Sequence, residues 1–395
     1  MKSLAFLLLI CSGISGQVVH RRPVPLSAAP VLPAAGSKAW TDFGTEVFRL
    51  TDDTDGQSCW HGYSYWSAIS RDNTKIVVSC LGGPRIVTID PAKLTRLSSE
   101  PLPAIPNLGV PNVESAHWSA LEASRLWVPF GSRIFRWSAT TKEYEEIKNL
   151  AANCPGGLRQ WSISADEQTF AGTCVTASGK HPIVWRRDSD TILYSEAPSS
   201  FDECQTDKSG RYLLIKPADP KSGQLVRLID LWTKRVQKIT AIAPDFGPGH
   251  SDMGQGVLVQ ASGYSGYAHG RTLEQFALSS ILTSSIWFEV RGAHVSMRGG
   301  NENWALFSVS HLLADRAKAF ANEFFFVSAD GTRRVWRVGR HYPGDGVFPA
   351  LKDSSYWSIP RAVASWDQSF VIFSSQNGTA GGRVDVYGIK SVSPK

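Results

Sequence analysis

Seven polar residues recur at equivalent places in this chain, each at the start of a short apolar stretch. Three are histidines, and the others are a tyrosine, a glutamine, a glutamate and an arginine. In chain order they are Tyr65, His117, Gln160 (preceded by Arg159), Glu203, His250, His294 and Arg361. Nine histidines scattered at random over 395 residues would not be expected to contribute three members to one such set. We call this set the polar column.

Side chains of these types bind cations and anions. Imidazole and carboxylate groups bind divalent transition metals, and carboxylate and amide oxygens also suit calcium or manganese. Each role has a structural alternative: His117 could hydrogen-bond a strand end, and Glu203 could neutralise an arginine. Asp252 could orient the His250 ring or cap a turn. The column predicts a ligand site, with a bound Mn or Ca ion as one option.

The column depends on a sequence repeat. The stretch 160–166 (QWSISAD) is matched closely by 65–72 (YWSAISRD) and in part by 117–121 (HWSAL). Each copy leads through a polar turn into a second apolar run, such as Ile76–Val78. A unit that recurs about every 40 to 50 residues is typical of propeller blades.

Seven inner strands are expected, near Trp66, Trp118, Trp161, Cys204, Ser251, Val295 and Val363. After the last of these, only three strands fit before the chain ends, and Glu46–Leu50 can supply the fourth. Such closure leaves no open edge between the first and last blades. The sequence predicts an all-β fold, a seven-bladed β-propeller whose last blade is closed by an N-terminal strand. Six or eight blades, or a pair of irregular β-sandwiches, are the alternatives. Residues 311–322 have a helical composition and are expected within an insertion.

The N-terminus has the composition of a secretory signal. Residues 1–16 combine Lys2, a short apolar core over Leu4–Ile10 and a run of small residues. The apolar core is too short to span a bilayer. Cys11 leaves a lipoprotein as an alternative. Residues 17–38 are rich in Pro and Ala and are expected to form a disordered linker before a propeller over 39–392. We expect a secreted or periplasmic protein without a transmembrane segment.

Two disulfides are predicted from the repeat. Cys59 and Cys154 each lie seven residues before a repeat tryptophan, and Cys80 and Cys174 close the second strands of the same blades. Export permits disulfides, so Cys59–Cys80 and Cys154–Cys174 are the expected pairs. Cys204 occupies the tryptophan position of another copy and is expected to be a buried free thiol.

The charge balance is mildly basic, with 41 Lys and Arg against 35 Asp and Glu, a formal net charge of +6. A basic soluble surface explains this excess, and attraction to an anionic ligand is the alternative. No Lys/Arg-rich run is interleaved with aromatic residues, so nucleic acid is not an expected partner. We expect a monomer.

Several stretches after residue 249 resemble bacterial secreted TolB-like propellers and, more distantly, oligogalacturonate lyases. They are 250–252 (HSD), 294–296 (HVS), 340–341 (RH), 360–363 (PRAV) and 373–378 (FSSQNG). Oligogalacturonate lyases hold manganese at the channel mouth with histidines and a glutamine, and they cleave polyuronates by β-elimination. The resemblance implies His250, His294 and His341 as metal ligands or bases, and Arg361 as a contact to a carboxylate. Where those lyases have a His-x-His pair, this chain has Arg361 and Val363, which puts a metal site of that type in doubt.

Two functions follow from these patterns. The first is a polysaccharide lyase acting on an anionic polysaccharide or oligosaccharide, with His250 or His294 as the base and Arg361, Arg298 or a metal stabilising the intermediate. The second is a non-catalytic binding or scaffold propeller of the TolB or WD type, because fold does not fix function. The expected ligand contacts at the channel mouth are His117, Arg159, Gln160, Glu203 and Arg298, whereas a scaffold propeller is expected to bind its partner through a rim loop.

Overall fold

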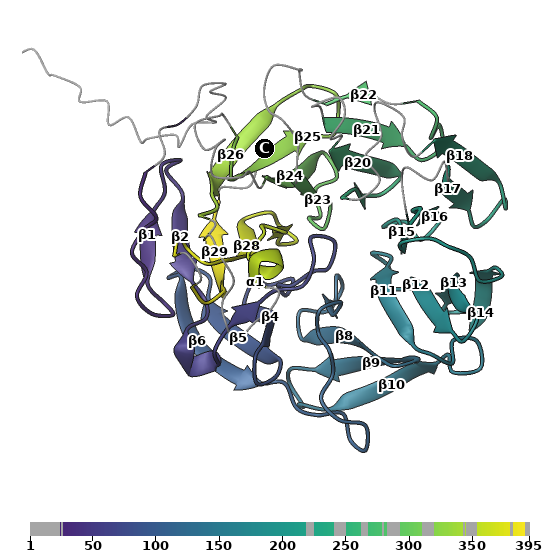
Figure 1. The fold of residues 1–395 in the computed structure, drawn as a ribbon, viewed down its shortest axis with the longest axis horizontal. Helices are drawn as coiled ribbons and strands as arrows, with labels where there is room; N and C mark the ends of the chain where they lie inside the picture. Colours follow the sequence, from purple (N-terminus) through teal and green to yellow (C-terminus); the bar gives the residue numbers. More distant parts are fainter. Residues whose placement is uncertain are drawn as a thin grey trace, which may run out of the picture.

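Seven antiparallel sheets stand in a ring around a central channel (Figure 1). The computed structural model describes residues 24, 27–218, 225–240, 250–261, 268–278, 280–282, 293–309, 320–342, 344, 354–379 and 382–391. Each sheet is one blade, and the chain passes through the blades in sequence order. The predicted seven-bladed β-propeller is confirmed.

The first three blades each contain four strands, numbered from the channel outwards. The first blade comprises β3 (Cys59–Trp60), β4 (Lys75–Cys80), β5 (Arg85–Asp90) and β6 (Thr95–Pro101). The second comprises β7 (His117–Trp118), β8 (Arg125–Phe130), β9 (Arg133–Ser138) and β10 (Tyr144–Asn149). The third comprises β11 (Leu158–Ile163), β12 (Thr169–Thr176), β13 (Gly179–Arg186) and β14 (Thr191–Ser195).

The next three blades repeat this order. The fourth comprises β15 (Cys204–Thr206), β16 (Tyr212–Ile215), β17 (Leu225–Asp230) and β18 (Val236–Thr240). The fifth comprises β19 (Asp252–Met253), β20 (Val257–Ala261), β21 (Ala268–Thr272) and β22 (Ser280–Ile281). The sixth comprises β23 (Ala293–Ser296), β24 (Trp304–Val309), β25 (Glu323–Ser328) and β26 (Val335–Arg340).

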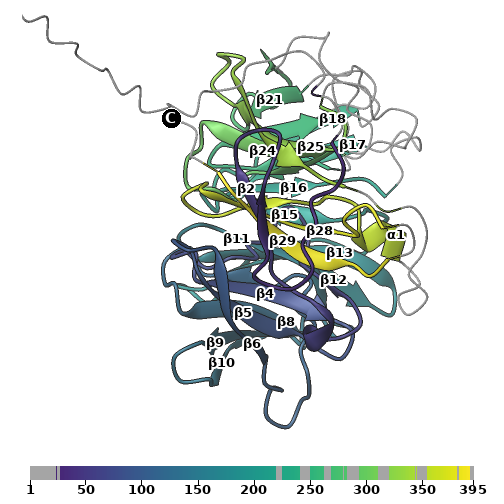
Figure 2. The same ribbon diagram turned by 90° about the vertical axis from the view of Figure 1, so that its left-hand side faces the viewer.

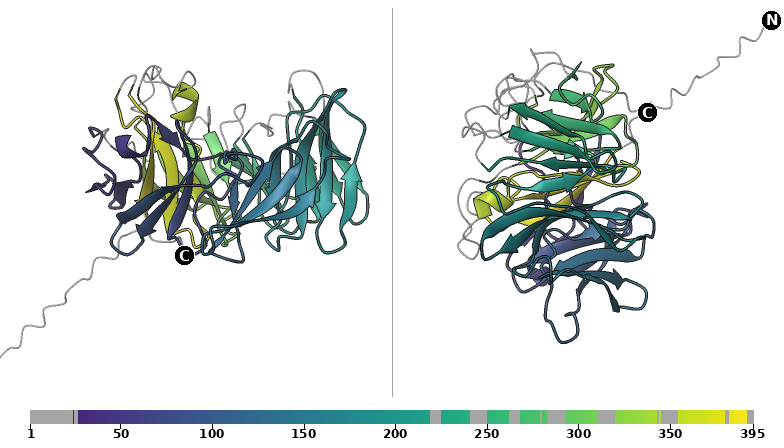
Figure 3. Two further views of the ribbon diagram at one scale, coloured as in Figure 1. Left: turned by 90° about the horizontal axis from the view of Figure 1, so that it is seen from below. Right: turned by 90° about the vertical axis from the view of Figure 1, so that its right-hand side faces the viewer.

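The last blade joins the two ends of the chain. From the channel outwards its strands are β27 (Val363–Ala364), β28 (Phe370–Ser375), β29 (Asp385–Lys390), β2 (Glu46–Arg49) and β1 (Lys38–Trp40). Strand β2 pairs antiparallel with β29, from Glu46 opposite Lys390 to Arg49 opposite Tyr387. The predicted closure by an N-terminal strand is therefore confirmed, and β1 adds a fifth strand outside it. Figures 2 and 3 show this blade and the ring from the side.

The first blade differs from the prediction at its inner edge. Its innermost strand is Cys59–Trp60, with only an isolated bridge between Ile69 and Ile76, and Trp66 lies in a turn. The indole of Trp66 instead donates a hydrogen bond to the Trp161 carbonyl of the third blade at 2.7 Å. The segment 61–67, which we call the channel loop, therefore reaches across the axis. A β-carbon on Gly62 would lie 2.2 Å from the Glu114 carbonyl oxygen, so only glycine fits there.

Both predicted disulfides are present, Cys59–Cys80 and Cys154–Cys174, and Cys204 is a buried free cysteine. Each bridge ties an inner strand or the loop before it to the second strand of the same blade.

The expected linker is only partly described. Residues 1–23 lie outside the described residues, as do 311–319 of the expected insertion helix. From Ser27 the chain packs on the last blade: Leu32 is buried in its core, and the Asn377 amide donates a hydrogen bond to the Pro30 carbonyl at 3.0 Å. The prediction of disorder therefore does not hold for 27–37, because this segment contributes apolar contacts to the fold.

Two helices occur in the described residues, the 3₁₀ turn η1 (Asp53–Asp55) and α1 (Ser354–Trp357). Neither they nor any other helical segment of that part of the chain has the length and apolar character needed to cross a membrane.

Candidate functional site

Two members of the polar column, His250 and His294, stack face to face where the innermost strands begin. Their ring centroids are 4.0 Å apart and their planes differ by 17°. His250 precedes β19, and His294 lies in β23, so neighbouring blades supply the pair. The Nδ1–H of His250 donates to the Ala293 carbonyl at 3.0 Å. This hydrogen bond leaves Nε2 of the neutral His250 ring as a proton acceptor. We call this end of the channel the upper mouth.

Both rings are held neutral by their surroundings. Burial lowers the pKa of His250, and the positive charge of Lys216 lowers it further. Burial likewise lowers the pKa of His294 well below its usual value, and His250 adds to the effect. Desolvation disfavours the charged form of an imidazole, so neither ring carries a proton charge near neutral pH. A neutral imidazole is the form that can act as a general base.

The channel loop places an aromatic ring against this pair. The Tyr63 ring centroid lies 5.1 Å from that of His294 and 6.4 Å from that of His250. Burial and the negative charge of Glu203 raise the pKa of Tyr63, so its phenol stays protonated. Tyr63 is therefore a proton donor beside two neutral imidazoles.

Arg361 lies in a cage of aromatic rings at the same mouth. Its Cζ is 4.2 Å from the ring centroid of Tyr356, 4.5 Å from that of Trp357 and 5.5 Å from that of Tyr63. Helix α1 provides the first two rings. The residue is 1% exposed. Nη2 donates to the Tyr356 carbonyl at 3.1 Å.

The remaining nitrogens of Arg361 are not satisfied by the described part of the chain. Neither Nε nor Nη1 has a hydrogen-bond partner there, and no carboxylate there lies within ion-pair distance. Burial lowers the pKa of the guanidinium, but an arginine remains a cation. A buried charge without a counter-ion is costly, and a bound anion would remove that cost. Arg361 thus has the chemistry of a carboxylate-binding residue.

Glu203, another member of the column, forms a buried ion pair with Lys216. The Lys216 ammonium donates to Glu203 at 2.6 Å and to the Ser251 carbonyl at 3.1 Å. The Tyr65 hydroxyl donates to the other Glu203 oxygen. The neutralising partner is a lysine, where the sequence suggested an arginine. These contacts fix the strand ends next to His250, and the Lys216 charge helps to keep that ring neutral.

His61 contacts the backbone of Arg361. Its Nδ1 lies 2.7 Å from the Ser374 hydroxyl, and its Nε2 lies 2.8 Å from the Arg361 carbonyl. Burial lowers the pKa of His61 to about 3. His61 is thus a neutral residue that positions the backbone of Arg361.

This burial predicts a pH-dependent stability. Between about pH 3 and pH 6.5 His61 binds a proton in the unfolded chain but not in the folded one, so the free energy of unfolding falls as the pH falls through this range. One such group contributes about 1.4 kcal/mol per pH unit. We expect His61→Asn to reduce the slope of the free energy of unfolding between pH 6 and pH 4 by that amount, measured by urea unfolding. An unchanged slope would contradict a buried neutral His61.

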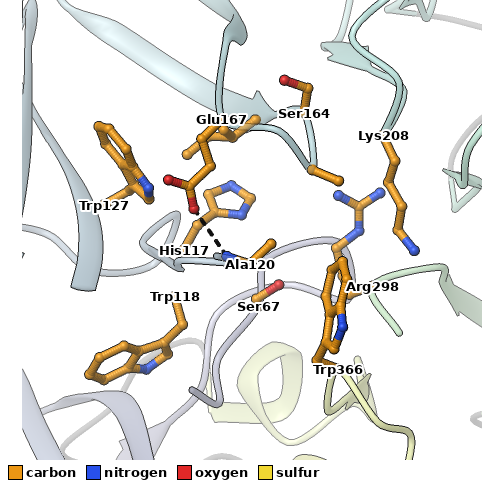
Figure 4. A pocket seen from close by; sticks show the side chains of 12 residues that line it. Ser67, His117, Trp118, Ala120, Trp127, Ser164, Glu167, Lys208, Arg298 and Trp366 are labelled. Atoms are coloured by element: carbon orange, nitrogen blue, oxygen red, sulfur yellow. Dashed lines mark hydrogen bonds between the residues drawn. The ribbon is translucent and has the colours of Figure 1, made fainter. Parts of the chain in front are cut away.

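His117 and Arg298 do not join the histidine pair. The Trp66 ring is 6.4 Å from the His117 ring and 6.0 Å from the Tyr63 ring, so two aromatic rings separate His117 from His294. Both residues instead line a small pocket at the opposite end of the channel, among the turns that follow the innermost strands (Figure 4). Arg298 is bound there to both oxygens of Asp252, at 2.9 and 3.1 Å. Asp252 therefore orients an arginine there.

The charged groups that line this small pocket already form hydrogen bonds and ion pairs within the protein. Glu167 accepts a hydrogen bond from the Ala120 backbone N–H at 3.0 Å (Figure 4) and a second one from the Ser119 hydroxyl. Lys208 forms an ion pair with Glu302 at 2.6 Å. Burial lowers the pKa of His117 to about 3. These contacts hold the turns together.

The residues suggested as metal ligands do not converge. His341 is buried between the last two blades, with its ring centroid 6.3 Å from that of Phe324 and 6.4 Å from that of Phe373. Its Nε2 lies 2.6 Å from the Ser358 carbonyl. The His250 and His294 rings stack on each other and do not point at a common centre. In the described residues no group of three His, Cys, Asp or Glu side chains could hold a metal ion. This donor set does not fit the manganese site that the resemblance implies.

Three residues of the upper mouth were not predicted from the sequence: Tyr63, Trp357 and Lys216. Lys216 could have been found, because a charged residue directly after the buried strand 212–215 indicates a buried ion pair. No sequence feature distinguishes Tyr63 and Trp357, since aromatic residues are abundant throughout this chain.

Solved structures with the same fold include oligogalacturonate lyases. One, in complex with manganese, aligns over 93% of this chain and 99% of its own, with a TM-score of 0.63 and 15% identity. Another, from Vibrio parahaemolyticus, aligns over 92% of this chain and 98% of its own, with a TM-score of 0.61 and 11% identity. TolB from Acinetobacter baumannii aligns over 72% of this chain and 64% of its own, with a TM-score of 0.39 and 13% identity.

No protein-family model matches the chain, and no curated protein sequence does either. The resemblance to oligogalacturonate lyases is thus found again among solved structures. At these identities the likeness shows the β-propeller fold alone, and a function has to be inferred from the residues of the upper mouth.

Proposed function

We propose that the upper mouth binds a uronate-containing oligosaccharide and cleaves it by β-elimination. The observation that carries the proposal is the buried guanidinium of Arg361, which has no counter-ion among the described residues and lies within the same cluster of rings as the neutral His250–His294 pair. The likeness in fold to oligogalacturonate lyases supports the choice of substrate class.

In this reaction the Arg361 guanidinium binds the uronate carboxylate. The Nε2 atom of His250 removes the proton from the carbon next to that carboxylate, and Arg361 stabilises the enolate-like charge that develops. The electron pair forms a carbon–carbon double bond as the bond to the leaving sugar oxygen breaks. That oxygen takes the phenol proton of Tyr63, which is restored from the imidazolium through water. The elimination involves no net oxidation or reduction, so it needs no further reactant.

The proposal assigns charge stabilisation to Arg361. The manganese of the lyase complex belongs to that protein, and the donor set here does not reproduce a site for it. A Mn or Ca ion, if one contributes, would be held by ligands other than the His250, His294 and His341 set. Comparing turnover after chelation and after adding each ion tests this point.

The direct test is the ultraviolet absorbance of the unsaturated product from polygalacturonate. We expect His250→Gln to lower kcat by roughly 10² to 10⁴, because glutamine keeps a donor for the Ala293 carbonyl but cannot act as the base. Substrate affinity should change little, which calorimetry measures. Absence of unsaturated product from wild-type protein on several polyuronates would rule the lyase out.

Binding without cleavage would favour the alternative, a non-catalytic binding propeller. In that case Arg361 would still be required for the ligand, and His250→Gln would leave affinity intact.

We also propose that the protein is exported and that it is a monomer. The two disulfides are compatible with a secreted or periplasmic location. N-terminal sequencing of protein expressed with residues 1–16, together with size-exclusion chromatography, tests both points.

A further inference from the structure

A recess of about 700 Å³ lies beside the upper mouth, between the second and third blades. Two residues belong to both places. Trp66 lines the recess, and its ring lies 6.0 Å from Tyr63. Glu114 also lines it; burial raises the pKa of this carboxyl group, and the positive charge of Arg361 opposes the shift. The recess therefore lies next to the cluster that holds Arg361.

Two cations, Arg159 and Lys180, line this recess. The Arg159 and Lys180 side chains are exposed, and neither forms an ion pair or hydrogen bond with the described residues. Several other cations of the second and third blades form ion pairs. The pairs are Arg133–Glu146, Arg136–Glu145, Lys142–Glu100 and Lys148–Asp190. Arg159 and Lys180 instead lie, without an ion pair to the described residues, where a ligand leaving the upper mouth would pass.

Part of the wall of the recess is backbone without side chains, which a ligand can approach closely. Gly131 and Gly156 line it and are exposed, so backbone is accessible there. A β-carbon on Gly156 would lie 2.7 Å from the Val175 carbonyl oxygen. Gln160 has a φ of 45°, in the left-handed region that non-glycine residues rarely adopt, within a register shift of β11. Such strained bulges often aim side chains at a binding site.

We propose that this recess is a subsite for the continuation of the same anionic chain. Arg159 and Lys180 bind carboxylates of uronate residues beyond the one held by Arg361, and the half-buried Phe130 ring contacts a sugar face. The inference rests on the proposed function and sharpens its substrate class: the protein prefers oligouronates of several residues over the dimer.

The test compares the double variant Arg159→Gln/Lys180→Gln with wild type, using di- and hexagalacturonate. We expect the wild-type affinity, measured by calorimetry, to rise with length, and the variant to lose at least tenfold for the hexamer and less than twofold for the dimer. The salt dependence of hexamer binding should weaken, because two charge contacts are lost. Methyl-esterified hexagalacturonate should bind both proteins alike. A double variant of exposed cations in the turns between the third and fourth strands of the first two blades, Lys93→Gln/Lys142→Gln, is the control with the same change in net charge.

A double variant that keeps the wild-type length dependence, or that loses the dimer and the hexamer equally, would overturn the subsite while leaving the proposed function in place. Wild-type protein that binds neither oligomer would overturn both. Wild-type protein that binds but does not cleave would overturn only the lyase, since calorimetry still reads the length dependence.

Discussion

Replacing Arg361 by methionine is expected to abolish uronate binding and turnover without lowering the stability of the fold. Methionine has a similar length and can pack among the three aromatic rings, whereas the charge it removes has no counter-ion in the described residues. Losing one preorganised charge contact typically lowers the rate by about 10² to 10³. We expect kcat/KM on oligogalacturonate to fall by at least that factor, with a melting temperature equal to or above that of wild type.

Arg337 provides the matched control, because it is an equally buried arginine that does have a counter-ion. Its Nε donates to Glu323 at 2.6 Å, and both side chains are almost fully buried. Arg337→Met should therefore destabilise the fold by about 3–5 kcal/mol, since it leaves Glu323 buried with a weakened set of partners. If Arg361→Met proved equally destabilising, Arg361 would be a structural residue, and the proposed anion site would lose its main support.

Replacing Lys216 by methionine is expected to be the most destabilising single change at the upper mouth. Lys216 and Glu203 are both almost fully buried, and the 2.6 Å ion pair is the only salt bridge that either forms in the described residues. Removing one member of such a pair leaves a buried charge uncompensated and costs about 3–5 kcal/mol. The free energy of unfolding from denaturant titration measures this loss.

The double variant Glu203→Gln/Lys216→Met separates this effect from a simple packing defect. Glutamine still accepts the Tyr65 hydroxyl hydrogen bond and carries no charge, so most of the lost stability should return. The pKa of His250 should rise in Lys216→Met, because the Lys216 charge lowers it in the wild type, and NMR titration of the ring reads this directly. Equal stability of the single and double variants would show that the ion pair is not the cause.

Much of the fold follows from local sequence patterns. Alternating apolar runs, separated by polar turns and repeated at blade-sized intervals, specify hairpins that must stack to bury their faces. The N-terminal strand and the two disulfides were predictable for the same reason, since equivalent positions in a repeat occupy equivalent places in space. The predicted position of the first inner strand, near Trp66, was wrong. Trp66 follows the repeat in sequence, but its indole donates a hydrogen bond across the channel to the Trp161 carbonyl.

The membership of the site could not be predicted in the same way. A repeat places His117, His250 and His294 at similar heights in their own blades, but it does not say which side chains occupy the axis. That depends on Tyr63 and Trp66, whose rings separate His117 from the other two.

The sequence by itself determined the ring of seven blades, its closure and its cysteine pairs, because these depend on periodicity and on neighbours along the chain. Only the tertiary structure decided that His250 and His294 stack, that Lys216 pairs with Glu203, and that Arg361 is caged by α1. Those contacts join residues from different blades and loops, and they are set by the packing of side chains around the axis. Long-range contacts of this kind have no period in the sequence.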